Sequence, residues 1–227
     1  MGLGTGTYAA QCGRYFPQAR VTGVEIDERI VQLAQTYFEL PNTVEAVVYD
    51  GRAYLADSEA RYDVIMVDAY QDITIPFQMS SKEFFELVKS HLKDDGVMVV
   101  NMNMRGMKEG NINQYLSDTI GSVFDTAVTV DVAGSSNREL FASDDPDIVK
   151  NLTKHTGELT NVNLKNMMQE VTSNLTEYQK GNYILTDDQA PVELLGMQVI
   201  DELIKDEVQY YKDIYKERGI KGLMESL

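Results

Sequence analysis

Along residues 1–146, the spacing of apolar positions switches repeatedly between the period of a strand and the period of a helix. Short β-branched or nearly all-apolar runs are typical of strands, and they lie at 20–26, 44–49, 62–67, 97–101, 127–132 and 139–143. Apolar residues at helical spacing predict helices at 28–37, 51–56, 80–92 and 112–124. This rhythm predicts an α/β fold, with a mostly parallel sheet, helices on both faces and a C-terminal antiparallel pair.

The pattern changes at residue 147. Residues 147–180 are polar and favour helix, 183–193 look like a loop, and 194–227 carry one or two amphipathic helices. We therefore predict a Rossmann-like nucleoside-binding domain at 1–146. The helical extension at 147–227 either belongs to that domain or packs on it.

Charge and composition narrow the possible partners. The chain has 20 basic and 36 acidic residues, a net charge of −16. This field repels nucleic acid and attracts a small cation, although acidity also simply keeps a protein soluble. One cysteine and two histidines argue against a disulfide or a metal site. Without a long apolar run or a signal peptide, we expect no membrane segment in this chain and a cytoplasmic protein.

A glycine-rich turn opens the chain, with Gly2, Gly4 and Gly6 in close succession. At a strand-to-helix turn, such glycines let the backbone approach a ligand and leave amides pointing at it. A mere tight turn is the alternative. The turn normally follows a buried strand, and we expect that this strand is missing through truncation or a misplaced start.

Acidic residues stand at the carboxyl ends of three successive predicted strands. Glu25 and Asp27 end one strand, and Asp50 and Asp68 follow the next two. Ligands bind at this edge of open α/β sheets, where a carboxylate can accept ribose hydroxyls. Helix capping is the favoured interpretation of Asp27 and the alternative for Asp50. For Asp68, the alternative is a polar strand terminus.

Together these motifs resemble the spermidine synthase family. The stretches run in the family's order over residues 2–143 and again at 183–195: GLGTG, GVEID, YDGRAYL, YDVIMVDAYQ, IPFQMSSKEFFELVKSHLKDDGVMVVN and LTDDQAPVELL. The chain is similar to a bacterial branch in which DAY replaces D-S-[ST]-D-P. The resemblance implies a Rossmann-like fold of the S-adenosylmethionine-dependent transferases, here without its first strand and N-terminal β-hairpin domain.

The resemblance also implies residue roles. Asp68 would be the catalytic base that takes a proton from the attacking amine. The expected contacts with decarboxylated S-adenosylmethionine are the ribose at Glu25, the adenine at Asp50, and the remainder at Gly2, Gly4, Gly6 and Gly51. The expected contacts with a polyamine are Tyr70, Asp72, Asp187 and Asp188. The alternatives are local packing for Tyr70 and a turn before Pro191 for the aspartate pair.

Gln71 departs from the family pattern, because the family places a second aspartate there. Asp72 lies one position further on and would substitute only if the loop shifts. Recognition of the distal amine of a diamine is therefore open. The expected loss of the first strand exposes apolar strand edges, so we also expect a homo-oligomer.

Three functions are compatible with these residues. The leading one is aminopropyl transfer from decarboxylated S-adenosylmethionine to a polyamine such as putrescine, without a metal. The second is methyl transfer from intact S-adenosylmethionine to a small acceptor. The third is an inactive truncated homologue.

Overall fold

The computed structural model describes residues 1–70, 74–103 and 108–226. Its helices are α1 (Thr7–Tyr15), α2 (Glu28–Tyr37), α3 (Gly51–Ala56), η1 (Phe77–Met79), α4 (Lys82–Ser90), α5 (Ile112–Val123), α6 (Ile148–Glu158), α7 (Val162–Asn174) and α8 (Val192–Ser226). Its strands are β1 (Val21–Glu25), β2 (Val44–Val48), β3 (Tyr62–Val67), β4 (Leu92–Met102), β5 (Thr126–Asp131), β6 (Arg138–Ser143) and β7 (Thr176–Glu177). The predicted alternation of strands and helices is confirmed.

Two hydrogen-bonded ladders form the sheet region. β1 pairs in parallel with β2, and a second ladder has the order β3-β4-β6-β5-β7. Within the second ladder β3 and β4 are parallel, whereas the other neighbours are antiparallel. The first three residues lie between the ladders: Gly2 N donates to Val24 O at 2.9 Å, and Asp68 N donates to Met1 O at 3.0 Å. The carboxyl ends of β1 and β3 therefore meet at the glycine turn.

Two details differ from the sequence-based expectation. The predicted helix at 80–92 and strand at 97–101 leave residues 93–96 between them, but these residues lie within the bounds of β4. They form an irregularity, because the β3–β4 pairing jumps from Tyr62↔Leu92 to Val64↔Val97. The second difference is β7, which adds to the free edge of β5. Two polar residues carry no period from which a strand could be predicted.

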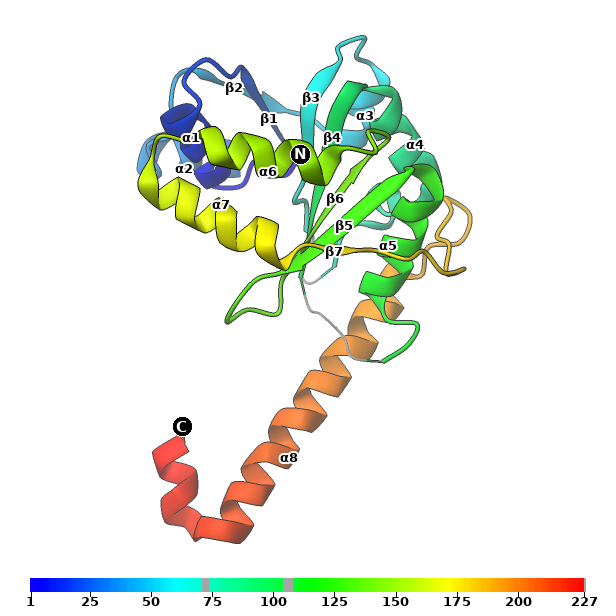
Figure 1. The fold of residues 1–227 in the computed structure, drawn as a ribbon. Coiled ribbons are helices and arrows are strands. Elements are labelled where there is room, and N and C mark those ends of the chain that lie inside the picture. The colour runs from blue at the N-terminus through cyan, green and yellow to red at the C-terminus, as the bar shows by residue number, and fades with distance from the viewer. Residues whose placement is uncertain (71–73, 104–107, 227) are drawn as a thin grey trace.

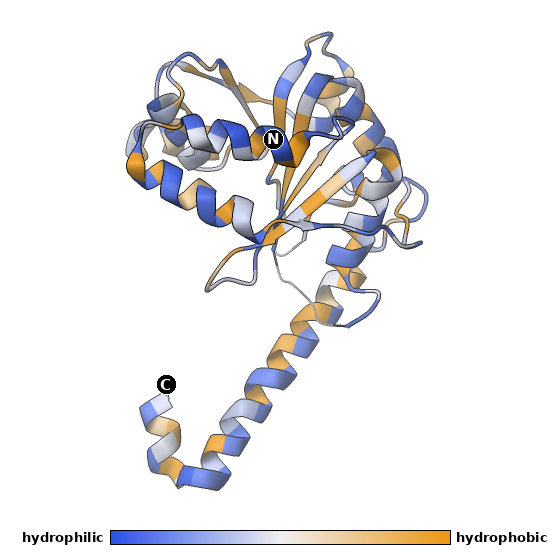
Figure 2. Ribbon diagram, in the orientation of Figure 1, coloured by the Kyte–Doolittle hydropathy of each residue, from blue (hydrophilic) through white to orange (hydrophobic). Residues whose placement is uncertain are grey.

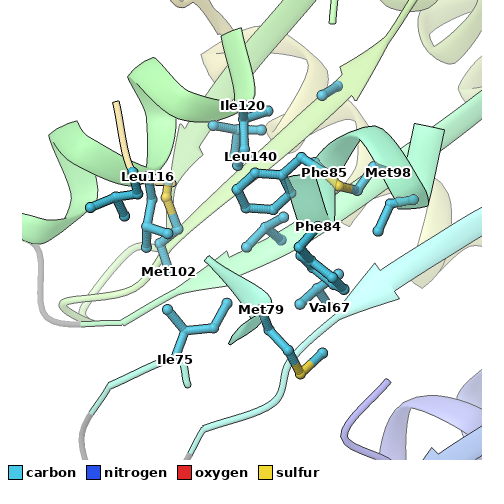
Figure 3. Close-up of a cluster of buried hydrophobic side chains, with 14 of the residues drawn as sticks. Val67, Ile75, Met79, Phe84, Phe85, Met98, Met102, Leu116, Ile120 and Leu140 are labelled. Carbon is cyan, nitrogen blue, oxygen red and sulfur yellow. The ribbon is translucent and has the colours of Figure 1, made fainter. Parts of the chain in front are cut away.

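Helices cover the strands on both sides (Figure 1). α3, α4 and α5 lie together on one side, and α1, α2, α6 and α7 lie on the other. The main core fills the space between β3, β4, β6 and the first of these groups (Figure 3), and its largest fully buried side chains include Val67, Phe84, Phe85, Met98, Leu116, Ile120 and Leu140. Ser81 caps α4 by accepting from Phe84 N at 3.3 Å.

α8 begins in the core and then leaves it. Val192 and Val199 are buried, whereas many of the apolar residues beyond them, such as Ile204, are exposed. Figure 2 shows these apolar positions along the projecting part of the helix, which bends at Gly219. In the described ranges, no helix combines the length and the apolar character that crossing a membrane requires. The predicted boundary between 146 and 147 stays a prediction.

The buried carboxylate of Asp118 ties the segment after β7 to α5. It accepts hydrogen bonds from Tyr178 Oη at 2.6 Å, Gly181 N at 2.8 Å and Tyr183 N at 3.0 Å. Its side chain is fully buried. These three donors have been withdrawn from water, so the carboxylate is a strong structural acceptor.

We predict that Asp118→Asn lowers the free energy of unfolding by about 2–3 kcal/mol, since an amide cannot satisfy three buried donors. Urea denaturation measures the effect. The matched change Asp95→Asn, at an exposed carboxylate, should stay within about 0.5 kcal/mol of the unaltered chain. Equal stabilities of the two variants would contradict this role for Asp118.

Candidate functional site

The glycine turn packs tightly at two of its glycines and is open at the third. Gly2, Gly4 and Gly6 have φ values of 76°, 55° and 79°, in the left-handed region that favours glycine. A Cβ on Gly2 would lie 2.3 Å from Asp68 O, and one on Gly6 would lie 2.4 Å from Leu40 Cδ1. A Cβ on Gly4 would meet nothing within 4 Å. The turn therefore abuts the end of β3 and leaves room for a ligand at Gly4.

Glu25 ends β1 directly against this turn. Its Oε2 accepts from Gly4 N at 2.9 Å, and its Oε1 accepts from Asp27 N at 3.2 Å. A carboxylate has about four lone-pair sites, so both oxygens can accept further hydrogen bonds. Asp27 itself accepts from Arg29 N at 2.8 Å and caps α2, which confirms the capping interpretation. The contact of Glu25 with a ribose stays a prediction.

Asp50 caps α3 by accepting from Ala53 N at 2.8 Å through Oδ1. Capping, one of its two interpretations, is thus confirmed. Gly51 is the first residue of that helix, and a Cβ on it would lie 3.2 Å from Met1 Sδ. The helix start is therefore close to the glycine turn, and the adenine contact predicted for this pair stays a prediction.

Asp68 follows β3 and is oriented by a chain of amides. Asn101 Nδ2 donates to Asp68 Oδ1 at 2.9 Å, and Asn137 Nδ2 donates to Asn101 Oδ1 at 3.0 Å. The preceding residue, Val67, points into the core. Because side chains alternate along a strand, Asp68 points to the opposite face, and its carboxylate is held in one orientation there.

Tyr70 packs locally, which is one of the two roles that the sequence analysis gives for it. Its hydroxyl donates to Asn101 O and accepts from Asn103 N at 3.0 Å, and burial raises the pKa of Tyr70 above its usual range. The hydroxyl is thus engaged with the backbone at the end of β4, and a substrate contact stays a prediction. Asp72 lies outside the described residues.

Residues 186–189 form a turn closed by hydrogen bonds from Thr186 N to Gln189 O at 3.2 Å and from Gln189 N to Thr186 O at 2.9 Å. Asp187 binds both Arg52 guanidinium nitrogens, at 2.7 and 2.6 Å, and accepts from Ser81 Oγ at 2.5 Å. The Arg52 partner holds the pKa of Asp187 below its usual value. This charge is already paired. Asp188 is exposed, and substrate contacts of both aspartates stay predictions.

Sequence reasoning missed Asn101, Asn137 and Glu139. Asn101 carries the same signal as Asp68, since it is a polar residue near the carboxyl end of an apolar strand. Glu139 gives no such signal because it lies near the start of β6, and only the antiparallel pairing of β6 with β4 brings it to this edge. Burial, followed by the nearby Asp68, raises the pKa of Glu139 to about 7.

Other candidate centres carry no equivalent chemistry. A cavity of about 570 Å³ lies beside α4 and the start of β4, away from the strand-end residues. Its cations include Lys89, paired with Asp144 at 2.8 Å, and Lys93, paired with Asp63 at 2.9 Å. Among residues 1–70, 74–103 and 108–226, no group of three or more His, Cys, Asp or Glu side chains is placed to hold a metal ion.

Sequence comparison identifies a family and a long relative. The family model described as the spermine/spermidine synthase domain matches residues 2–133. A probable polyamine aminopropyl transferase of Bifidobacterium longum is 49% identical over 244 aligned residues, which include 100% of this chain and 55% of that protein. This chain therefore spans about half the length of that relative.

Solved structures share the fold. A probable spermidine synthase from Corynebacterium glutamicum has a TM-score of 0.56 and 23% identity, over 78% of this chain and 70% of that chain. Human methyltransferase-like protein 13, crystallised with SAH, has a TM-score of 0.58 and 22% identity, over 82% and 86%. The predicted Rossmann-like transferase fold is thereby confirmed.

Glu25→Gln should weaken binding of methylthioadenosine by roughly 30-fold, the equivalent of about 2 kcal/mol for hydrogen bonds to a charged acceptor. Isothermal titration measures the affinity. Asp27→Asn removes a charge two residues away, at a helix cap, and should leave the affinity within about two-fold. If the Gln variant binds like the unaltered chain, Glu25 has been assigned to the ribose wrongly.

Proposed function

The chain belongs to the spermine/spermidine synthase family, and we propose that it transfers an aminopropyl group from decarboxylated S-adenosylmethionine to a polyamine such as putrescine. One observation carries the assignment of the site. The backbone carbonyl of Asp68 abuts the turn at Gly2, and Asn101 holds the carboxylate of the same residue. A nucleoside on the turn and a base at the end of β3 would then share one site.

The nucleoside half of this site would use backbone and carboxylate groups. The turn at Gly2, Gly4 and Gly6 would contact the co-substrate where Gly4 leaves space. Glu25, anchored to Gly4 N, would accept the ribose hydroxyls. Asp50, which caps α3 through one oxygen, would use the other for the exocyclic amine of adenine, with Gly51 beside it.

The chemical step needs an amine with a free lone pair. Polyamine nitrogens are protonated at neutral pH, so a carboxylate that accepts the proton in the transition state lowers the barrier. The amine nitrogen attacks the methylene carbon next to the sulfonium, the carbon–sulfur bond breaks, and its electron pair leaves with methylthioadenosine. Asp68 takes the amine proton. Since Asn101 engages Oδ1, the proton would go to Oδ2.

The acceptor half would depend on negative charge. The chain's net charge of −16 attracts a cationic polyamine at long range. Tyr70, Asp72, Asp187 and Asp188 remain proposed contacts of the acceptor, of which Asp187 already pairs with Arg52.

We predict that Asp68→Asn lowers kcat for methylthioadenosine release by at least ~100-fold, the low end for loss of a general base. Affinity for methylthioadenosine should stay the same, because Asp68 faces the acceptor. Asp63→Asn is the matched control. It makes the same change at the opposite end of β3, at an exposed residue that pairs with Lys93, and should leave kcat unaltered.

Two results would overturn the proposal. If Asp68→Asn and the unaltered chain turn over at the same rate, Asp68 is not the general base. Release of S-adenosylhomocysteine from intact S-adenosylmethionine, without methylthioadenosine release from the decarboxylated form, would replace aminopropyl transfer by methyl transfer.

A further inference from the structure

Glu139 lies on the same face of the sheet as Asp68, two strands away. Val67 pairs with Val100, which places the next residue, Asp68, beside Asn101, and Asn101 pairs with Glu139. Leu140, the next residue on β6, is fully buried in the main core. Because successive side chains point to opposite faces, Glu139 points away from that core, as Asn101 and Asp68 do.

One oxygen of the Glu139 carboxylate is buried without a hydrogen-bond partner. Within the described part of the chain, nothing bonds to its Oε2, and this atom is shielded from solvent. The neighbouring Asn101 donates through Nδ2 to Asp68 and accepts through Oδ1 from Asn137. An unpaired buried carboxylate is costly to a fold. A ligand that supplies the missing donor removes that cost.

The ligand that fits is a cation with more than one nitrogen. Two carboxylates on one face repel each other, and a positively charged donor reverses that cost. Two strand spacings separate the backbones of Asp68 and Glu139, about 10 Å. The amide of Asn101 stands between them. This separation suits one nitrogen at each carboxylate better than one nitrogen shared by both.

We propose that Glu139 binds the non-reacting ammonium of a diamine acceptor while Asp68 holds the nitrogen that attacks. This role rests on the proposed aminopropyl transfer, and it makes Glu139 a specificity-determining residue. The acceptor class that follows is a linear aliphatic diamine.

The test compares 1,4-diaminobutane with 1-aminobutane, which keeps the reacting nitrogen and lacks the second one. Isothermal titration is run at pH 8 on the chain saturated with methylthioadenosine. The unaltered chain should bind the diamine at least ten-fold more tightly than the monoamine. Glu139→Gln should bind the two amines with equal affinity, while Glu170→Gln, at an exposed carboxylate on α7, should keep the preference.

Every other outcome contradicts either the role of Glu139 or the proposed function. An unaltered preference in Glu139→Gln, or no preference in the unaltered chain, overturns the role of Glu139 and leaves the proposed function standing. Failure of the unaltered chain to bind methylthioadenosine overturns the proposed function, and the role of Glu139 with it. Equal losses for both amines in Glu139→Gln would place the glutamate on the reacting nitrogen and overturn the assignment.

A stability measurement tests whether Glu139→Gln folds and whether the Glu139 carboxylate is buried in the folded chain. The titratable groups that face Glu139 are Asp68, Tyr70 after β3, and Tyr8 on α1. Because the pKa of Glu139 is raised to about 7 in the folded chain, its ionisation there disfavours folding, and stability is lost as pH rises from about 4.5 to 7. In urea denaturation, Glu139→Gln should lack this loss, match the unaltered chain at pH 4 and exceed it at pH 8. A variant that is less stable at pH 8 would contradict the burial of this carboxylate.

Discussion

The close approach of Gly2 to the backbone of Asp68 sets the dimensions of the whole site. Only a glycine fits there, because any Cβ would lie 2.3 Å from a carbonyl oxygen and the φ of 76° lies in the left-handed region. The same turn donates to Val24 at the end of β1. One contact region thus fixes both the position of the proposed nucleoside turn and its spacing from the proposed base.

The positions of the polar site residues follow from the directions of the strands. β1, β2, β3 and β4 bring Glu25, Asp50, Asp68 and Asn101 to one edge because their ladders are parallel. β6 runs the other way, so its first residues reach the edge at which β4 ends. The antiparallel return therefore places Asn137 and Glu139 where a wholly parallel sheet would place a strand's last residues. In the site that we propose, the reversal of β6 thus brings acceptor contacts to the same edge as the nucleoside turn.

The sequence predicted the elements well where a period or a cap was present. The bounds of α2, α3 and β3 agree with the predicted ranges, and Asp27 caps α2 as expected. The two residues of β7 and the irregular residues 94–96 show no hydrophobic periodicity from which they could have been predicted. For the proposed site, Glu25 and Asp68 were predicted from their place after a strand, and their roles stay predictions. Glu139 could not be found so, because its nearness to Asp68 depends on which strands pair, a property of the tertiary fold rather than of local sequence.

The acidic residues of this chain fall into groups according to the partners of their carboxylates. Asp118 is satisfied by three donors, and Asp187 by a guanidinium and a hydroxyl, so folding itself accounts for their charge. Asp27 and Asp50 are helix caps, the ordinary use of aspartate before a helix. Glu139 differs, since a buried oxygen lacks a donor and its pKa lies near neutrality. A carboxylate oxygen that the fold leaves unpaired, on the same face as a second carboxylate that an amide holds in place, supports our proposal that the missing positive charge arrives with the substrate.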